Sequence, residues 1–133
     1  MQFKKITIIR TEIPRDMTTN QQIQLFGGSL GLFNLRDKDK SCFRIFIVLL
    51  KNLKKDGMTS DELALKTKLT RGTVVHHLNK LMDSGIVINH RNRYILNVDN
   101  IHGLMQRIRK NVNKTLADLD EVAKELDERL GLQ

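Results

Sequence analysis

Residues 59–94 read TSDELALKTKLTRGTVVHHLNKLMDSGIVINHRNRY, and this stretch decides the fold. It begins with two short helical patterns. Thr59 can cap the first helix, whose first turn carries Asp61 and Glu62, where the helix dipole favours negative charge. Thr70 is a good N-cap for the second helix. The apolar residues of that second helix fall on one face: Val74, Val75, Leu78, Leu81 and Met82.

Two β-prone runs follow, at 86–89 and 93–96, and the polar residues 90–92 join them as a hairpin. A helix, a short turn, a second helix and a hairpin make the winged helix-turn-helix arrangement. The second helix of a helix-turn-helix lies in the major groove of DNA. We therefore expect a mainly α fold with a small β-hairpin, in the α+β class. Residues 70–84 would read the DNA and the 86–96 hairpin would be the wing.

The polar face of the 70–84 helix is suited to DNA. Between residues 66 and 93 the sequence has six lysines and arginines and a single acidic residue, Asp83, a balance that favours an approach to phosphates. The predicted contacts to bases and phosphates are Thr70, Arg71, Thr73, His76, His77 and Lys80 on the helix and Arg91 and Arg93 at the wing. A solvated helix face is the alternative, and His77 could equally be a half-buried residue that orients the helix.

The run TVVHHLNKLMDSGIV at 73–87 resembles the winged helix-turn-helix regulators of the ArsR/MarR kind. Those regulators carry a recognition helix ending in H-L-x-x-L and then G-[IL]-V at the start of the wing. The matching residues are His77, Leu78, Leu81, Gly85, Ile86 and Val87. The resemblance implies a DNA-binding transcription regulator, and it suggests repression by blocking the promoter. ArsR metal sensors often carry a Cys-x-Cys pair in the first helix of the motif, whereas residues 61–64 read DELA.

Composition narrows the choice of partner and compartment. The 133 residues carry a formal net charge of +8 and a pI of about 9.9, which favours a polyanionic partner. A single cysteine, Cys42, excludes an internal disulfide and favours the cytoplasm. The sequence has no apolar run of about 18 residues, so we expect no membrane span. Cys42 stands beside an apolar stripe and is predicted to be a structural, buried thiol.

The sequence predicts neither an enzyme nor a cofactor, because no catalytic set or cofactor fingerprint appears. Residues 27–31 read GGSLG but lack the spacing of a phosphate-binding loop, so a hinge is expected. No metal site is predicted, since His76 and His77 are adjacent and point about 100° apart on a helix. An interfacial site that uses His102 and Asp99 is the alternative. No small-molecule effector is assigned.

We divide the chain into three parts. Residues 1–36 form an N-terminal extension with a short strand at 3–10, a short helix at 21–26 that stops at the glycines 27–28, and an apolar segment. Residues 37–98 form the winged domain, whose central helix extends to about residue 55. Its predicted buried stripe is Phe43, Phe46, Ile47, Leu50 and Leu53.

Residues 99–133 contain the longest helical pattern, which starts near Asn100 and would be ~45 Å long. Its apolar residues alternate gaps of four and three, a heptad repeat interrupted by Thr115. The near half is basic and the far half is mostly acidic, so two antiparallel copies would place unlike charges together. We predict a homodimer with antiparallel helices that meet through Ile101, Met105, Ile108, Val112, Leu119, Val122 and Leu126. A hairpin back onto the N-terminal segment is the competing explanation.

The predicted function is a homodimeric, sequence-specific regulator that binds double-stranded DNA. The rival is a winged-helix module for protein–protein interaction or assembly, because a fold does not determine a function. Salt dependence discriminates between them, since DNA binding weakens steeply as salt rises and apolar assembly does not. RNA binding is a third possibility, which competition between duplex DNA and structured RNA would test.

Overall fold

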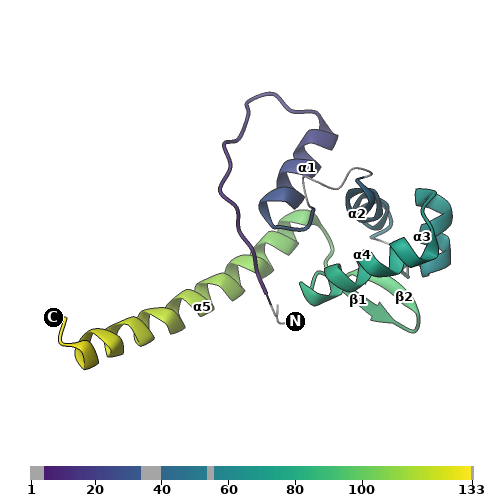
Figure 1. The fold of residues 1–133 in the computed structure, drawn as a ribbon. Helices are drawn as coiled ribbons and strands as arrows, with labels where there is room; N and C mark the ends of the chain where they lie inside the picture. The colour runs from purple at the N-terminus through teal and green to yellow at the C-terminus, as the bar shows by residue number, and fades with distance from the viewer. Residues whose placement is uncertain (1–4, 34–39, 54–55, 133) are drawn as a thin grey trace.

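The computed structural model describes residues 5–33, 40–53 and 56–132, and this part of the chain contains five helices and one antiparallel hairpin (Figure 1). In chain order the elements are α1 (Thr19–Ser29), α2 (Ser41–Lys51), α3 (Ser60–Thr67), α4 (Arg71–Asp83), β1 (Val87–His90), β2 (Arg93–Leu96) and α5 (Ile101–Leu130). The predicted fold class, a winged helix with a long C-terminal helix, is confirmed.

The core of the winged domain is built around α2. Phe46 and Ile45 on this helix are fully buried, and they share one cluster with Leu63 of α3 and Leu78 of α4. The buried stripe predicted for this helix was only partly right. Ile45 and Leu49 are buried, whereas Ile47, Leu50 and Leu53 are half-buried. The buried face is wider than one heptad stripe because α1, α3, α4 and β2 all contact this helix. The helix also ends earlier than predicted, at Lys51.

Threonine and asparagine caps start three of the helices at the predicted places. The hydroxyl of Thr59 accepts a hydrogen bond from the Glu62 amide at 3.1 Å, and that of Thr70 accepts one from the Thr73 amide at 3.2 Å. The side chain of Asn100 starts α5 in the same way. The first amides of a helix have no hydrogen-bond partner inside it, and these caps supply one. Each of the three helices therefore begins next to the cap that the sequence predicted.

The N-terminal extension differs from its prediction. No strand forms within the described residues 5–10, and the sheet of the described chain consists of β1 and β2 alone. The segment lies extended and donates one backbone hydrogen bond, from Ile9 to the Ser29 carbonyl at 2.7 Å. Helix α1 runs through the two glycines that were expected to stop it. Gly27 is buried, and a Cβ there would overlap the ring of Phe33, so glycine permits this close packing.

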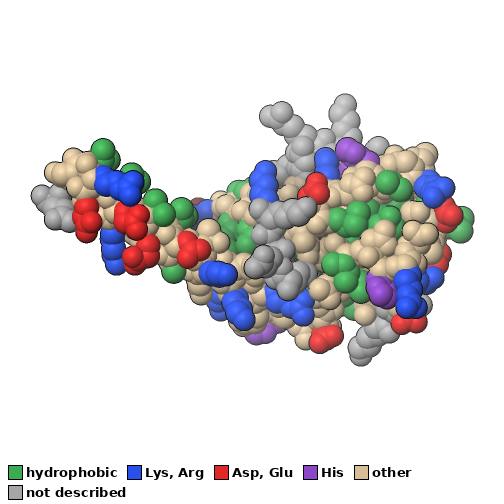
Figure 2. Space-filling view, turned by 90° about the horizontal axis from the view of Figure 1, so that it is seen from below, with side chains coloured by type: hydrophobic (Ala, Val, Ile, Leu, Met, Phe, Trp, Pro, Cys, Tyr) green, Lys and Arg blue, Asp and Glu red, His purple; other side chains and the backbone are tan. Residues whose placement is uncertain are grey.

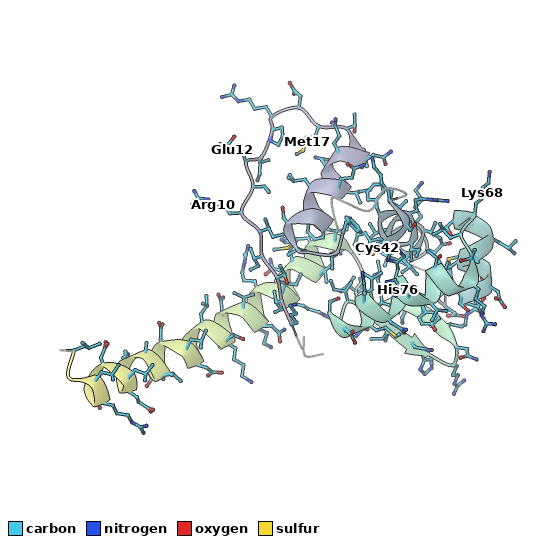
Figure 3. All side chains as sticks on the ribbon, viewed as in Figure 1. Arg10, Glu12, Met17, Cys42, Lys68 and His76 are labelled. Atoms are coloured by element: carbon cyan, nitrogen blue, oxygen red, sulfur yellow. The ribbon has the colours of Figure 1, made fainter. Side chains whose placement is uncertain are left out.

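Cys42 is buried, as predicted, and its thiol donates to the Leu32 carbonyl at 3.2 Å. Leu30, Leu32 and Phe33 pack on the core, which holds the end of α1 against the winged domain. Figure 3 shows Cys42 among the packed helices and Lys68 at the outer end of α3. The proposed boundary between the N-terminal extension and the winged domain, at residues 36–37, lies outside the described residues.

Helix α5 begins on the body and then leaves it (Figure 1). Leu104 and Ile108 are buried in the chain's own core, and Met105 and Val112 are half-buried against it. Every residue from 113 to 130 is exposed. The near half of α5 thus packs on its own domain, and the far half does not fold back onto the described residues. None of the helices in the described part combines the length and the apolar run needed to cross a membrane.

Candidate nucleic-acid interface

Helix α4 has a buried face and a polar face, and the buried face determines which residues point outward. Val74, Leu78 and Leu81 are buried against α2 and α3. On the polar side Arg71, His76 and Lys80 are exposed, while Thr73 and His77 are half-buried. Figure 3 labels His76 on this helix. The structure thus gathers on one helix the polar residues predicted there.

Asn79 is a polar residue of this face that the sequence reasoning missed. It is exposed and lies three positions after His76, so the two share one side of α4. An asparagine side chain can bond the edge of an adenine in the major groove. Its spacing of three residues from His76 was the sequence signal that could have placed Asn79 among the predicted contacts.

Two threonines of the predicted site form the start of α4. The hydroxyl of Thr70 donates to the hydroxyl of Thr73 at 2.9 Å while it accepts from the Thr73 amide. Thr70 is therefore engaged as the helix cap, and the turn before it is short because Lys68 ends α3 in the left-handed conformation, with φ of 58°. This cap stabilises the first turn of α4, which begins with Arg71.

Arg71 has a carboxylate neighbour from the first helix of the motif. Its Nε lies 3.6 Å from Oδ1 of Asp61, and the side chains are 72% and 76% exposed. An ion pair so open to solvent contributes little to stability, because water screens it. Arg71 can thus exchange Asp61 for a phosphate or a base at little cost.

The two histidines of α4 lie side by side and have different surroundings. Their ring centroids are 5.4 Å apart with an interplanar angle of 64°, an edge-on contact. His76 is exposed, whereas His77 is half-buried. His76 is therefore the better placed of the two to reach a ligand from solvent. Within the described ranges, no group of three or more His, Cys, Asp or Glu is placed to hold a metal ion.

The wing is a tight hairpin with a basic tip. Strands β1 and β2 pair from Val87 with Leu96 to His90 with Arg93, which leaves Arg91 and Asn92 as the turn. Both turn residues have positive φ, 53° and 65°, as a two-residue turn of type I′ requires. Arg91 is exposed at this tip. A basic side chain at such an exposed tip is free to contact a phosphate of bound DNA.

Arg93, the other predicted wing contact, faces the body of the domain. Its Nε donates to the Asp56 carbonyl at 3.2 Å, and its terminal nitrogen donates to the Gly57 carbonyl at 3.0 Å. The same nitrogen lies 3.4 Å from Oε1 of Glu62. Arg93 thus ties the hairpin to the start of α3. Tyr94 reinforces this tie, since its backbone pairs with that of Met58 and its ring packs on the core.

A helix, a three-residue turn, a second helix and a wing define the winged helix-turn-helix class of DNA-binding proteins. Residues 47–89 match the family model described as bacterial regulatory protein, arsR family, which spans the end of α2, the helix-turn-helix and most of β1. A search of curated proteins and a search of solved structures returned no match. Residues 47–89 are therefore similar to the DNA-binding region of ArsR-family regulators, and this match supports a role in DNA-binding transcription regulation.

Proposed function

We propose that this protein is a homodimeric repressor that binds a specific sequence of double-stranded DNA. Helix α4 lies in the major groove, and the β1–β2 hairpin acts as the wing beside it. Repression would follow when the dimer occupies a promoter, the mode of action that the resemblance to ArsR/MarR-like regulators suggests. The winged domain reads the DNA, and α5 joins two copies.

The polar face of α4 is the observation that carries this proposal. Val74, Leu78 and Leu81 fix the rotation of the helix, so the side chains of Arg71, His76, Asn79 and Lys80 face solvent, and each can form hydrogen bonds with DNA. No acidic residue occurs between Arg71 and Lys80. A face that approaches phosphates and base edges must avoid carboxylates, because they repel the backbone.

An exposed apolar stripe on the far half of α5 supports dimerisation. Leu119 is 57% exposed and Val122 is 51% exposed, and a helix this apolar on one side is unusual when it has no partner. The stripe consists of Leu116, Leu119, Val122, Leu126 and Leu130. Of the predicted dimer residues, Ile108 instead belongs to the chain's own core, and Met105 and Val112 partly do. We therefore propose that the partner meets the far half of α5.

Charge supports an antiparallel pairing. Figure 2 shows acidic side chains gathered on the projecting part of α5 and basic ones on the part beside the body. The basic residues of the near half are Arg107, Arg109, Lys110 and Lys114. Antiparallel copies bring each acidic half toward the partner's basic half, whereas parallel copies stack like charges. Exposed pairs are worth only tenths of a kcal/mol each, so they select the orientation and the apolar stripe supplies the affinity.

A binding selection from random duplex DNA tests the proposal. The intact protein is expected to enrich a two-fold-symmetric motif whose half-sites lie about one helical turn apart, roughly 34–36 Å. A variant with Arg71→Ala and His76→Ala should lose that motif. The matched control, Lys51→Ala with His102→Ala, removes one basic residue and one histidine outside α4 and should retain the motif. If no motif is enriched and all three proteins bind weakly and equally, specific regulation through α4 is wrong.

A further inference from the structure

The extended segment before α1 exposes three isoleucines. Ile8 is 62% exposed, Ile9 is 49% exposed and Ile13 is 75% exposed. All three lie within residues 8–13, whereas exposed apolar residues on the surface of a monomer are usually scattered. Apolar side chains gathered in this way indicate a surface that binds a partner.

The same segment is basic. Lys5 and Arg10 are exposed, and the ion pairs found in the part of the chain that the structure describes involve neither of them. Glu12 is the single acidic residue between positions 5 and 15. Because interfaces pair surfaces of opposite charge, the segment suits a partner surface that is both apolar and acidic.

The far half of α5 is such a surface. Residues 116–130 contain six acidic residues and two basic ones, and all of them are exposed. The apolar residues form two neighbouring lines along the helix, of which the first is Leu119, Val122 and Leu126 and the second is Leu116, Ala123 and Leu130. At about 100° per residue the two lines together span roughly 120°, which is wider than the seam that one helix covers in a coiled coil. Asp120 and Asp127 border the second line.

An antiparallel dimer brings this surface to the N-terminal segment. Within one chain, Ile6 and Thr7 line a hollow together with Ile108, so the segment lies against the near half of α5 (Figure 1). When two α5 helices cross near Leu119, the partner's Leu130 lies opposite Ile108, because both positions are eleven residues from the crossing. The partner's helix covers the first apolar line, and the second line then faces the N-terminal segment.

We propose that residues 5–13 of each copy dock on the far half of the partner's α5. Ile8 and Ile9 contact the second apolar line near its end at Leu130, and Lys5 lies beside Asp127. Each copy gives one segment and receives one, so the contact obeys the two-fold symmetry of a homodimer. The inference rests on the proposed antiparallel dimer, and it does not depend on DNA binding.

Disulfide formation between two single-cysteine proteins tests the contact. Both carry Cys42→Ser, whose hydroxyl can still donate to the Leu32 carbonyl. One also carries Ile8→Cys and the other Leu130→Cys. After subunit exchange and mild oxidation, the mixed disulfide should be the main product. The control replaces Ile8→Cys by Leu65→Cys, at an 81% exposed position on α3, and should give less than a tenth as much mixed disulfide.

Sedimentation equilibrium of the same proteins under reducing conditions separates the ways in which the test can fail. A dimer that forms no more mixed disulfide than the control would refute the docked segment and leave the proposed dimer standing. A monomer would refute the proposed dimer and the docked segment with it. Rapid linkage of Leu130→Cys to its own copy would show parallel helices and would also overturn the docking.

Charge reversal is a second test. Lys5→Glu and Asp127→Lys should each raise the dissociation constant of the dimer about three- to fivefold at low salt, and the two changes together should restore it. Glu128→Lys makes the same change about 100° further around the helix, so Lys5→Glu should not compensate for it. If Lys5→Glu compensates for both changes equally, the effect is one of net charge and the docking is wrong.

Discussion

Nε of Arg71, the first residue of α4, lies 3.6 Å from Oδ1 of Asp61 on the preceding helix, α3. The pair joins the two helices of the helix-turn-helix at their exposed edge. If Arg71 binds a DNA phosphate as proposed, that phosphate must compete with the Asp61 carboxylate for the guanidinium group. Asp61 thus competes with DNA for a side chain that we assign to DNA binding.

Asp61→Asn is expected to tighten the binding of duplex DNA about two- to fivefold. The change removes a competitor of the phosphate and one negative charge near the interface. The free energy of unfolding should change by less than about 0.5 kcal/mol, because the pair is highly exposed. Fluorescence anisotropy with a labelled duplex measures the affinity, and urea titration measures the stability.

Glu121→Gln is the control for Asp61→Asn, since it removes the same charge from the far half of α5. It should leave the duplex affinity within a factor of two. If both variants tighten binding equally, the effect is one of net charge and Arg71 is not specifically restrained by Asp61.

The two arginines of the wing should respond differently to substitution. Arg91→Gln is expected to weaken duplex binding and to lower the slope of log affinity against log salt by about one, as the loss of one phosphate contact requires. The free energy of unfolding of the Arg91→Gln variant should not change. Arg93→Gln is expected to cost about 1–3 kcal/mol of unfolding free energy, because two backbone carbonyls lose a charged donor.

Salt titrations and thermal melts of the two variants, run in parallel, check this division. A variant of Arg93 that melts like the intact protein would show that its contacts to Asp56 and Gly57 do not hold the wing. An unchanged salt slope in Arg91→Gln would remove the wing tip from the DNA interface.

Gly57→Ala is expected to destabilise the winged domain by about 2 kcal/mol or more. Gly57 has φ of 89°, a conformation that strains any residue with a Cβ. The added Cβ would also overlap the side chain of Ile95 and lie 3.0 Å from the Tyr94 carbonyl oxygen. Gly72→Ala, at a helical position with open space around it, should be neutral or slightly stabilising. Urea denaturation of both variants makes the comparison.

The apolar stripe of α5 should determine the oligomeric state. Val122→Asp is expected to convert a dimer into a monomer in sedimentation equilibrium and to lower duplex affinity by at least tenfold, because one half-site is lost from each complex. Ala117→Asp places the same charge on another side of this exposed helix and should keep the dimer. Val122→Asp that remains dimeric would show that the partner binds elsewhere.

The orientation of the pair can be read from spin labels placed at residue 129 of each copy. If the axis lies near residue 119, antiparallel helices separate the two labels by about 30 Å, since ten residues rise about 15 Å on each side. Parallel helices would hold them near the interaxial distance of roughly 8–10 Å, plus the length of the labels. Labels at residue 120 should be close in either orientation, which makes them the control for dimer formation.

The sequence alone determined the elements of the winged domain. Thr59, Thr70 and Asn100 start their helices where predicted, because a cap needs only a local hydrogen bond. The buried face of α4 also followed from periodicity, since one side of a helix that packs on a core must be apolar. Five of the eight predicted DNA contacts lie on this helix, and a sixth, Thr70, caps it.

Only the tertiary structure decided the relations between distant residues. Spacing did not indicate that Arg93 turns back to Asp56 and Gly57, that Asp61 meets Arg71, or that Ile108 lies in the chain's own core. An apolar heptad position looks the same whether it is covered by its own domain or by a partner. What covers it depends on where the rest of the chain lies, and a local pattern of residues does not contain that information.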